Sequence, residues 1–218
     1  TLTAAILTTT LATIAFSIDS MLPALPVIAT ELTPDAPNSA QLILTSFVLG
    51  MGIGTFIAGP LSDSFGRRRI IVFGAILYCS ASVAAYFAPT LETVLLARVV
   101  QGLGAAGPRV VAIALVRDLY KGRDMARIVS FAMMIFTLVP AVAPLAGSGL
   151  ISLYGWRSIF VAFILFSVIS VTWLLLRQPE TLPLENRRPF RAAPLFSALK
   201  EVLSHRIIVT TIAVQTLV

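Results

Sequence analysis

The chain has 218 residues, of which 57% are hydrophobic and 12% are charged, and its formal net charge is +6. Soluble domains are about 45–50% apolar and about 25% charged, so this composition excludes an ordinary soluble globular protein. The basic residues stand between long apolar runs and not along one accessible face, which argues against a nucleic-acid partner and indicates membrane topology.

Six apolar runs are long enough to cross a bilayer as helices, which takes about 20 residues each. They lack the alternating pattern of barrel strands, and backbone polar groups inside hydrocarbon must bond within their own segment, so helices are predicted. In chain order the predicted spans are Leu2–Leu22, Ala40–Pro60, Ile70–Ala88, Leu91–Leu115, Ile128–Leu150 and Ile159–Leu176. We therefore expect an all-α integral membrane protein surrounded by the lipid bilayer.

The apolar runs divide the chain into three parts. Residues 1–176 are expected to form a six-helix transmembrane bundle. Residues 177–206 are polar and contain four prolines, so they are expected to form a cytoplasmic linker between bundles, with a candidate amphipathic helix near its end. A new apolar run starts at Ile207, so residues 207–218 are expected to begin a seventh helix. We expect the polypeptide to be part of a longer one.

The distribution of basic residues predicts the orientation of the bundle. Three arginines follow the second run, four basic residues follow the fourth and six follow the sixth, whereas the alternate gaps hold only Arg157. Lysine and arginine accumulate in cytoplasmic loops. The N-terminus and the three basic gaps are therefore expected in the cytoplasm.

Two charges lie deep in apolar runs: Asp19 in the first, and Arg98 about 10 Å along a helix from Leu91 in the fourth. An arginine there costs at least about 2.5–3.5 kcal/mol unless it is paired or hydrated. The first run leads outward and the fourth leads inward, so Asp19 and Arg98 are expected at comparable depth in the bilayer. We hypothesise that these two charges are coupled electrostatically, directly or through water. Arginine does not readily release a proton, so its role would be to set the pKa of the acid. The alternative is that Asp19 only caps the helix end at the interface.

A charged turn joins the second and third runs, Gly59-Pro60-Leu61-Ser62-Asp63-Ser64-Phe65-Gly66-Arg67-Arg68-Arg69. Its carboxylate and guanidiniums can form a fixed ion-pair cluster, although positive-inside topology alone is the simpler interpretation. The turn resembles the signature of the major facilitator superfamily between its second and third helices, G-x-L-x-D-x-x-G-R-R. The resemblance implies a cytoplasmic gate that latches the two halves of a transporter. Its residues would be Gly59, Asp63, Gly66, Arg67, Arg68 and, after the fourth run, Asp118.

The fourth run carries a stripe of small and basic residues, because Gly102 follows Arg98 by four positions and Arg109 returns to nearly the same helix face. Such a stripe, with Gln101 beside it, should face protein or a water-filled cavity and not lipid. The segment 95–106 resembles the helix-four motif of the same superfamily, whose arginine is implicated in proton transfer. We expect Met21, Gln101, Gly102 and Arg109 to line the substrate cavity.

The fifth run contains Pro140 and Pro144, which remove backbone hydrogen bonds from a helix and kink it. Gly147 and its small neighbours permit close helix packing. The segment resembles the exporter motif of the superfamily, a G-P-x-x-G-G-like element that seals the cavity against ion leak. Ala143 replaces its first glycine and Ser148 its last.

Four further segments resemble the Bcr/CflA branch of drug-resistance exporters: Asp19–Pro26, Ala143-Pro144, Gly155–Phe160 and Pro179–Leu182. The resemblance implies the N-terminal half of a 12-helix fold, built from three-plus-three inverted repeats, in the bacterial inner membrane. It also implies alternating access, in which apolar drugs such as bicyclomycin or phenicol antibiotics leave in exchange for protons. The remaining partner would be the missing C-terminal six-helix half.

Enzymatic chemistry is not expected, because the sequence offers no nucleophile–base pair, no metal-ligand spacing and no phosphate loop. We expect no cofactor and no metal, with protons as the coupling ion. Two alternatives remain open. One is a proton-coupled importer of the same fold, and the other is a membrane scaffold subunit that transports nothing.

Overall fold

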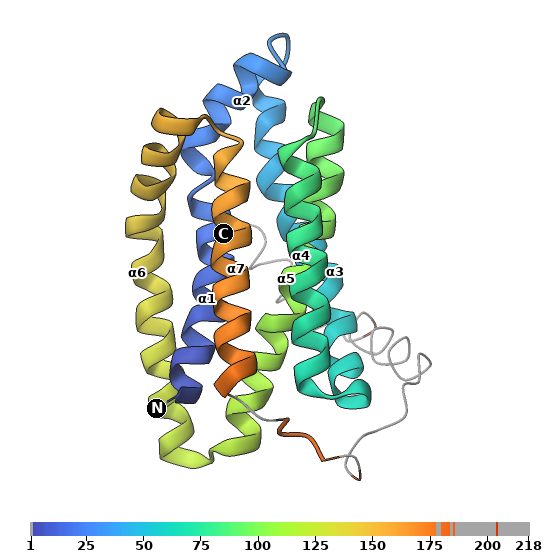
Figure 1. Ribbon diagram of the computed structural model, residues 1–218, viewed down its shortest axis with the longest axis vertical. Coiled ribbons are helices and arrows are strands. Elements are labelled where there is room, and N and C mark those ends of the chain that lie inside the picture. Colours follow the sequence, from blue (N-terminus) through green and yellow to red (C-terminus); the bar gives the residue numbers. More distant parts are fainter. Residues whose placement is uncertain (1, 178–179, 184, 186–203, 205–218) are drawn as a thin grey trace. The chain divides into compact units, whose positions relative to one another are not determined.

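The computed structural model describes residues 2–177, 180–183, 185 and 204, with side chains from residue 8 onward. Helices and turns make up this described part, which contains no strand. The long helices stand side by side (Figure 1). They are α1 (Leu2–Asp19), α3 (Leu42–Phe65), α4 (Arg67–Tyr86), α5 (Leu91–Leu119), α6 (Gly122–Tyr154) and α7 (Ser158–Arg177). The short helices η1 (Leu22–Ala24), α2 (Leu25–Leu32) and η2 (Pro37–Gln41) connect α1 to α3.

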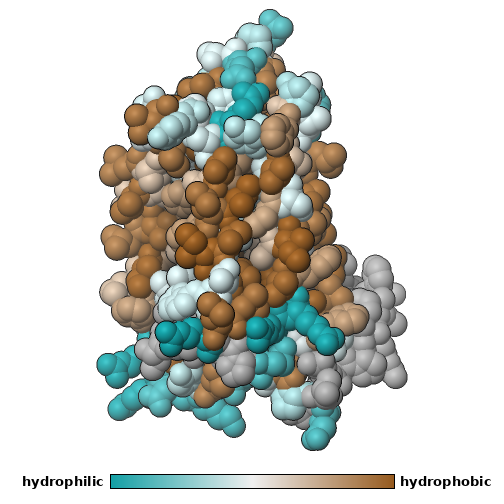
Figure 2. Space-filling model, viewed as in Figure 1, coloured by the Kyte–Doolittle hydropathy of each residue, from teal (hydrophilic) through white to brown (hydrophobic). Residues whose placement is uncertain are grey.

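Six stretches of the described chain are helical, long and apolar enough to cross a membrane. Large apolar side chains such as Phe56, Phe73 and Leu145 are exposed on the outside of the bundle, where lipid can cover them. Figure 2 shows a broad hydrophobic band across the middle of one face, with hydrophilic residues gathered at both ends. The predicted all-α membrane fold is confirmed.

Several helices run further than the apolar runs predict. The first membrane span continues through η1 and α2 to Leu32, beyond the predicted end at Leu22. Helix α6 covers Gly122–Tyr154, whereas the apolar run covers Ile128–Leu150. Polar residues at the ends of a helix project into water. The apolar run in the sequence therefore stops before the helical backbone does. Most of the predicted linker and the predicted seventh helix lie outside the described residues.

The helix contacts repeat between two three-helix units, α1–α3–α4 and α5–α6–α7. Helix α5 packs against α3 and α4, and α1 packs against α6 and α7 in the same way. If α1, α3 and α4 are exchanged with α5, α6 and α7 respectively, these contacts map onto each other. The α1–α5 and α4–α7 contacts map onto themselves. This pattern is the one that a three-plus-three inverted repeat produces.

Helices α3 and α5 cross with their backbones in contact. A Cβ atom on Gly50 would lie 2.0 Å from the carbonyl oxygen of Val99, and one on Gly102 would lie 2.1 Å from that of Phe47. Small residues at such positions let membrane helices approach closely. A Cβ atom on Gly52 of the same helix would meet nothing within 4 Å. The crossing therefore depends on particular glycines and not on every glycine of α3.

Candidate functional site

Arg98 is the largest fully buried side chain among the described residues. Its Nε donates to the carbonyl oxygen of Ile43 at 3.3 Å, Nη1 to Gln101 Oε1 at 2.6 Å and Nη2 to the carbonyl oxygen of Ser17 at 3.0 Å. The guanidinium carbon also lies 4.4 Å from the centre of the Phe47 ring, in cation–π geometry. These neutral groups from α1, α3 and α5 stabilise the charge inside the bundle.

The carbonyl of Ser17 is available to Arg98 because α1 ends there. The backbone N–H of Met21 donates to the oxygen of Ile18 at 3.3 Å, and so does not follow the α-helical pattern, which would use Ser17. The carboxyl end of a helix carries a partial negative charge of about one half. Arg98 therefore places its positive charge against the negative end of α1.

Further buried hydrogen bonds connect α5 to α4 and α4 to α1, and both sets involve Tyr78. Gln101 Nε2 donates to Ser82 Oγ at 2.7 Å, and Ser82 Oγ donates to the carbonyl of Tyr78 at 2.8 Å. The hydroxyls of Tyr78 and Ser17 lie 2.5 Å apart. Because buried polar groups must be satisfied, this network fixes the relative positions of α1, α4 and α5.

Asp19 is the last residue of α1 and is partly buried. Its carboxylate has no ion pair with any described residue, Arg98 included. The predicted direct pairing is therefore corrected: the donors of Arg98 are occupied by backbone and amide oxygens, one of them on Ser17, two residues before Asp19. Coupling of the two charges through water stays a prediction.

The predicted cavity residues are mostly enclosed in this structure. Met21 and Gln101 are fully buried, and Gly102 lies against the α3 backbone. Arg109 is half-buried, with Nη1 3.7 Å from the sulfur of Met51. The stripe faces protein, as expected, but Met21, Gln101 and Gly102 do not form an open wall, because tight packing of α1, α3 and α5 covers them.

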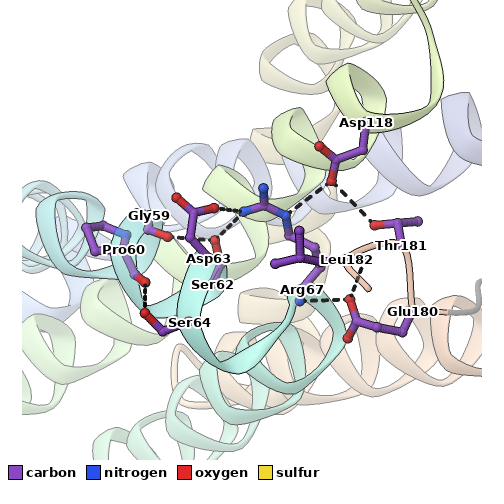
Figure 3. A network of polar contacts seen from close by, with 10 residues as sticks. All are labelled: Gly59, Pro60, Ser62, Asp63, Ser64, Arg67, Asp118, Glu180, Thr181 and Leu182. Carbon is purple, nitrogen blue, oxygen red and sulfur yellow. Dashed lines mark hydrogen bonds and ion pairs between the residues drawn. The ribbon is translucent and has the colours of Figure 1, made fainter. Parts of the chain in front are cut away.

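Arg67 joins the turn between α3 and α4 to the end of α5 (Figure 3). Its Nη1 donates to Asp63 Oδ1 at 2.6 Å and to Ser62 Oγ at 2.7 Å, while Nε lies 3.3 Å from Asp118 Oδ2. Gly66 makes the turn with φ of 98°, a conformation that favours glycine. Gly59 contributes its carbonyl, which accepts a hydrogen bond from Ser62 Oγ at 2.8 Å. The predicted gate residues are thus brought together.

Glu180, beyond the end of α7, also belongs to this cluster and was not predicted. Its carboxylate accepts the backbone N–H groups of Arg67 at 3.0 Å and Arg68 at 3.1 Å, which are the first two residues of α4. The Arg68 side chain in turn donates to the carbonyl of Leu175 in α7 at 2.9 Å. A carboxylate at a helix amino end satisfies free N–H groups and the helix dipole. The Pro179–Leu182 segment was the only sequence signal for this contact.

Replacing Glu180 by alanine is expected to lower the free energy of unfolding by about 1 kcal/mol, because the first turn of α4 loses its cap. Thermal unfolding of the purified protein in detergent measures the change. Glu185→Ala is the matched control, since the exposed Glu185 has no hydrogen bond or ion pair with the part of the chain that the structure describes. Equal destabilisation by both variants would contradict the capping role.

The fifth-run prolines, Pro140 and Pro144, lie inside α6, which is one uninterrupted helix. Gly147 follows one turn later, where a Cβ atom would lie 2.3 Å from the carbonyl oxygen of Ser20. Helix α6 therefore packs directly against the broken end of α1, next to Asp19. The predicted close packing at Gly147 is present, and its role in sealing an exporter stays a prediction.

Comparison with known proteins identifies the family. The model of the Major Facilitator Superfamily matches residues 6–218. The "Bicyclomycin resistance protein homolog" of Haemophilus influenzae is 34% identical over 176 residues, which are 81% of this chain and 44% of the relative. The "Chloramphenicol resistance protein" of Pseudomonas aeruginosa is 35% identical over 165 residues, 75% of this chain and 39% of the relative.

Solved structures show the same fold. A D-xylose-proton symporter superposes with a TM-score of 0.67 at 18% identity, covering 97% of this chain and 55% of the symporter. The human organic anion transporter MFSD10 gives 0.69 at 16% identity, covering 86% of this chain and 50% of that protein. The chain thus spans about half the length of these transporters and somewhat less of the two resistance proteins. It belongs to the major facilitator superfamily of membrane transporters.

Proposed function

We propose that the chain is the N-terminal half of a proton-coupled exporter of apolar drugs, working by alternating access with a second six-helix half. The relatives named as a bicyclomycin resistance protein homolog and a chloramphenicol resistance protein support this substrate class. A single observation carries the coupling mechanism. Asp19 is the last residue of α1, the helix whose Ser17 carbonyl accepts a hydrogen bond from Arg98, and the Asp19 carboxylate has no partner among the described residues.

Physical chemistry gives Asp19 a means to couple protons to conformation. An ionised carboxylate at the carboxyl end of a helix is unfavourable, and the nearby cation of Arg98 offsets this repulsion. A proton on Asp19 removes the negative charge and so changes how strongly the end of α1 is attracted to Arg98. Because α1 packs against α6 at this level, the change reaches a second helix of the bundle. Proton binding and drug binding then bias the same conformational equilibrium.

The proposed orientation places the gate around Arg67 in the cytoplasm of a bacterial cell, with the protein in the inner membrane. The arginines 67–69 and the basic residues of the turn between α5 and α6 support this, because both turns lie at the end of the bundle where α1 begins (Figure 1). Modification of single cysteines in those turns by a membrane-impermeant reagent, in intact and in opened cells, tests the orientation.

Exchanging Asp19 for asparagine is expected to lower proton-driven export by about tenfold or more, because the variant keeps the shape of the side chain but cannot take up a proton. The measurement is drug efflux from proteoliposomes that hold the complete two-half transporter, after an imposed pH gradient. Asp35→Asn is the matched control, since Asp35 is an exposed acid in the loop between α2 and η2. Unchanged export by Asp19→Asn would remove the acid from the mechanism.

The direction of transport needs its own measurement. Cells that express the complete protein are expected to accumulate less labelled antibiotic than cells that lack it. Greater accumulation would indicate the importer alternative. Proteoliposomes that move neither protons nor drug would indicate the scaffold alternative.

A further inference from the structure

An apolar groove lies between α3 and α4 on the outside of the bundle. Both helices pack against α5 and much less against each other, so α5 contributes to the floor of the groove. The floor consists of small buried residues such as Gly54, Gly74 and Gly107, and the rim includes the exposed side chains of Ile57 and Phe73. The groove is therefore open to the surroundings of the bundle, which in a membrane are lipid.

The size and lining of the groove fit a hydrocarbon chain. Its volume is about 150 Å³, which is below the range of about 300–1,000 Å³ that is typical of sites for drug-sized molecules. On α4 it extends from Ile70 to Leu77, or about 10 Å along the helix axis. Every residue that lines it is apolar. A segment of an extended acyl chain fits such a groove, whereas a drug-sized or polar molecule does not.

Arg69 is the member of the arginine run 67–69 whose head group contacts no described residue. The Arg67 side chain binds Asp63 and Asp118, and the Arg68 side chain donates to a carbonyl of α7. Arg69 is exposed, and it makes no hydrogen bond, ion pair or ring contact with the part of the chain that the structure describes. Its positive charge is therefore available to a partner that is not among these residues.

The position of Arg69 on α4 places this charge at one end of the groove. Arg69 directly precedes Ile70, and Phe73 on the rim follows it by four residues, or about 6 Å along the helix axis. Side chains of a helix lean toward its amino end, and α4 begins at Arg67. The Arg69 side chain therefore extends away from the apolar groove toward the water at the start of the helix. The groove and the free guanidinium follow one another along the same line from hydrocarbon to membrane surface.

We propose that the α3–α4 groove and Arg69 together bind one anionic phospholipid, with an acyl chain in the groove and the head-group phosphate against the guanidinium. Arginine binds phosphate oxygens through paired N–H donors, and basic sites between membrane helices bind anionic head groups. The groove alone would accept a chain from any lipid, so the charge of Arg69 provides the preference for an anionic one. The proposal depends on neither the direction of transport nor the role of Asp19.

Native mass spectrometry of the complete protein in detergent tests the site. The protein is titrated with phosphatidylglycerol and with phosphatidylcholine that carry the same acyl chains, and phosphatidylglycerol is expected to bind more tightly. Arg69→Gln is expected to weaken phosphatidylglycerol binding about fivefold and to leave phosphatidylcholine binding unchanged. Arg69→Lys should retain most of the binding, because it keeps the charge. Unchanged phosphatidylglycerol binding by Arg69→Gln, or equal binding of the two lipids to the unmodified protein, would overturn the proposal.

Matched variants separate a site from general charge and general hydrophobicity. Arg127→Gln removes an equally exposed cation without a described partner from α6, which does not line the groove, and should leave lipid binding unchanged. An equal loss in Arg127→Gln and Arg69→Gln would mean that the lipid follows net charge only. Ile57→Trp narrows the groove and should weaken binding, whereas Ile53→Trp, one turn away on α3 and outside the groove, should not. Equal binding by the two tryptophan variants would place the acyl chain elsewhere.

Photolabelling locates the lipid in a bilayer. Phosphatidylglycerol with a photoactivatable group in its acyl chain, in vesicles that hold the complete protein, should label residues 54–61 and 70–77, and Arg69→Gln should lower this label about fivefold. A second apolar hollow, whose lining includes Phe16 and Leu138, contains no charged residue, and its label should not change. Absence of label from the groove, as when a helix of the second half covers it, would overturn the proposal. Neither experiment requires drug or a proton gradient, so failure here leaves the exporter proposal standing.

Discussion

Replacing Gly102 by alanine is expected to destabilise the bundle by about 3 kcal/mol or more, although it adds a single methyl group. The new Cβ atom would lie 2.1 Å from the carbonyl oxygen of Phe47 and 2.7 Å from the backbone nitrogen of Met51. Both neighbours are backbone atoms of α3, so no side-chain rotation can relieve the overlap. Helices α3 and α5 must separate, and the buried contacts around Arg98 must loosen with them.

Gly52→Ala is the matched control, because a Cβ atom there meets nothing within 4 Å. It should leave stability unchanged or raise it by up to about 1 kcal/mol, since alanine favours helix more than glycine does. Thermal or chemical unfolding of the purified protein in detergent measures both variants. Similar stability of the Gly102 and Gly52 variants would show that the α3–α5 crossing is looser than the structure has it.

Replacing Arg98 by alanine is expected to lower the free energy of unfolding by about 3 kcal/mol or more. Two buried acceptors, the carbonyl of Ser17 and the amide oxygen of Gln101, would lose their donor, and each buried acceptor left unpaired costs about 1–3 kcal/mol. The carbonyl of Ile43, which lies within α3, would lose its bond to Arg98 as well. Transport should be lost as well, because the end of α1 is no longer held. Unfolding and efflux assays on the same preparation measure the two effects.

Arg98→Lys separates geometry from charge. Lysine keeps the positive charge but carries one compact ammonium, which cannot span acceptors that belong to three helices. We therefore expect Arg98→Lys to recover little of the stability. Arg109→Lys is the matched control, since the only contact of the Arg109 head group with described residues is a long one to a thioether. Full stability of Arg98→Lys would mean that charge alone matters at this position.

The sequence was most informative where a signal is local. Long apolar runs predicted all six spans, and the charged turn predicted that Asp63 and Arg67, four residues apart in the sequence, would lie together. Helix ends were less accurate, as α6 shows, because hydropathy reports the width of the membrane and not the length of the helix.

Contacts between distant residues were mostly missed. The backbone oxygens of Ser17 and Ile43 accept from Arg98, and no side-chain pattern marks a backbone acceptor. For this reason the charge of Arg98 suggested a carboxylate partner, Asp19, which the structure does not place against it. Glu180 was missed because its partners lie more than 100 residues away in sequence, although the segment containing it had been recognised by resemblance.

The hydrogen bonds from Arg98 to main-chain oxygens affect how the sequence of this protein can vary among homologues. Every residue type presents a carbonyl, so position 43 can change from isoleucine to another apolar residue of similar size and still offer the same acceptor. Related proteins should therefore keep the arginine while the identity of the residue it touches on α3 drifts. In an alignment of homologues, a contact of this kind should therefore appear as an invariant donor residue, with no second position that co-varies with it.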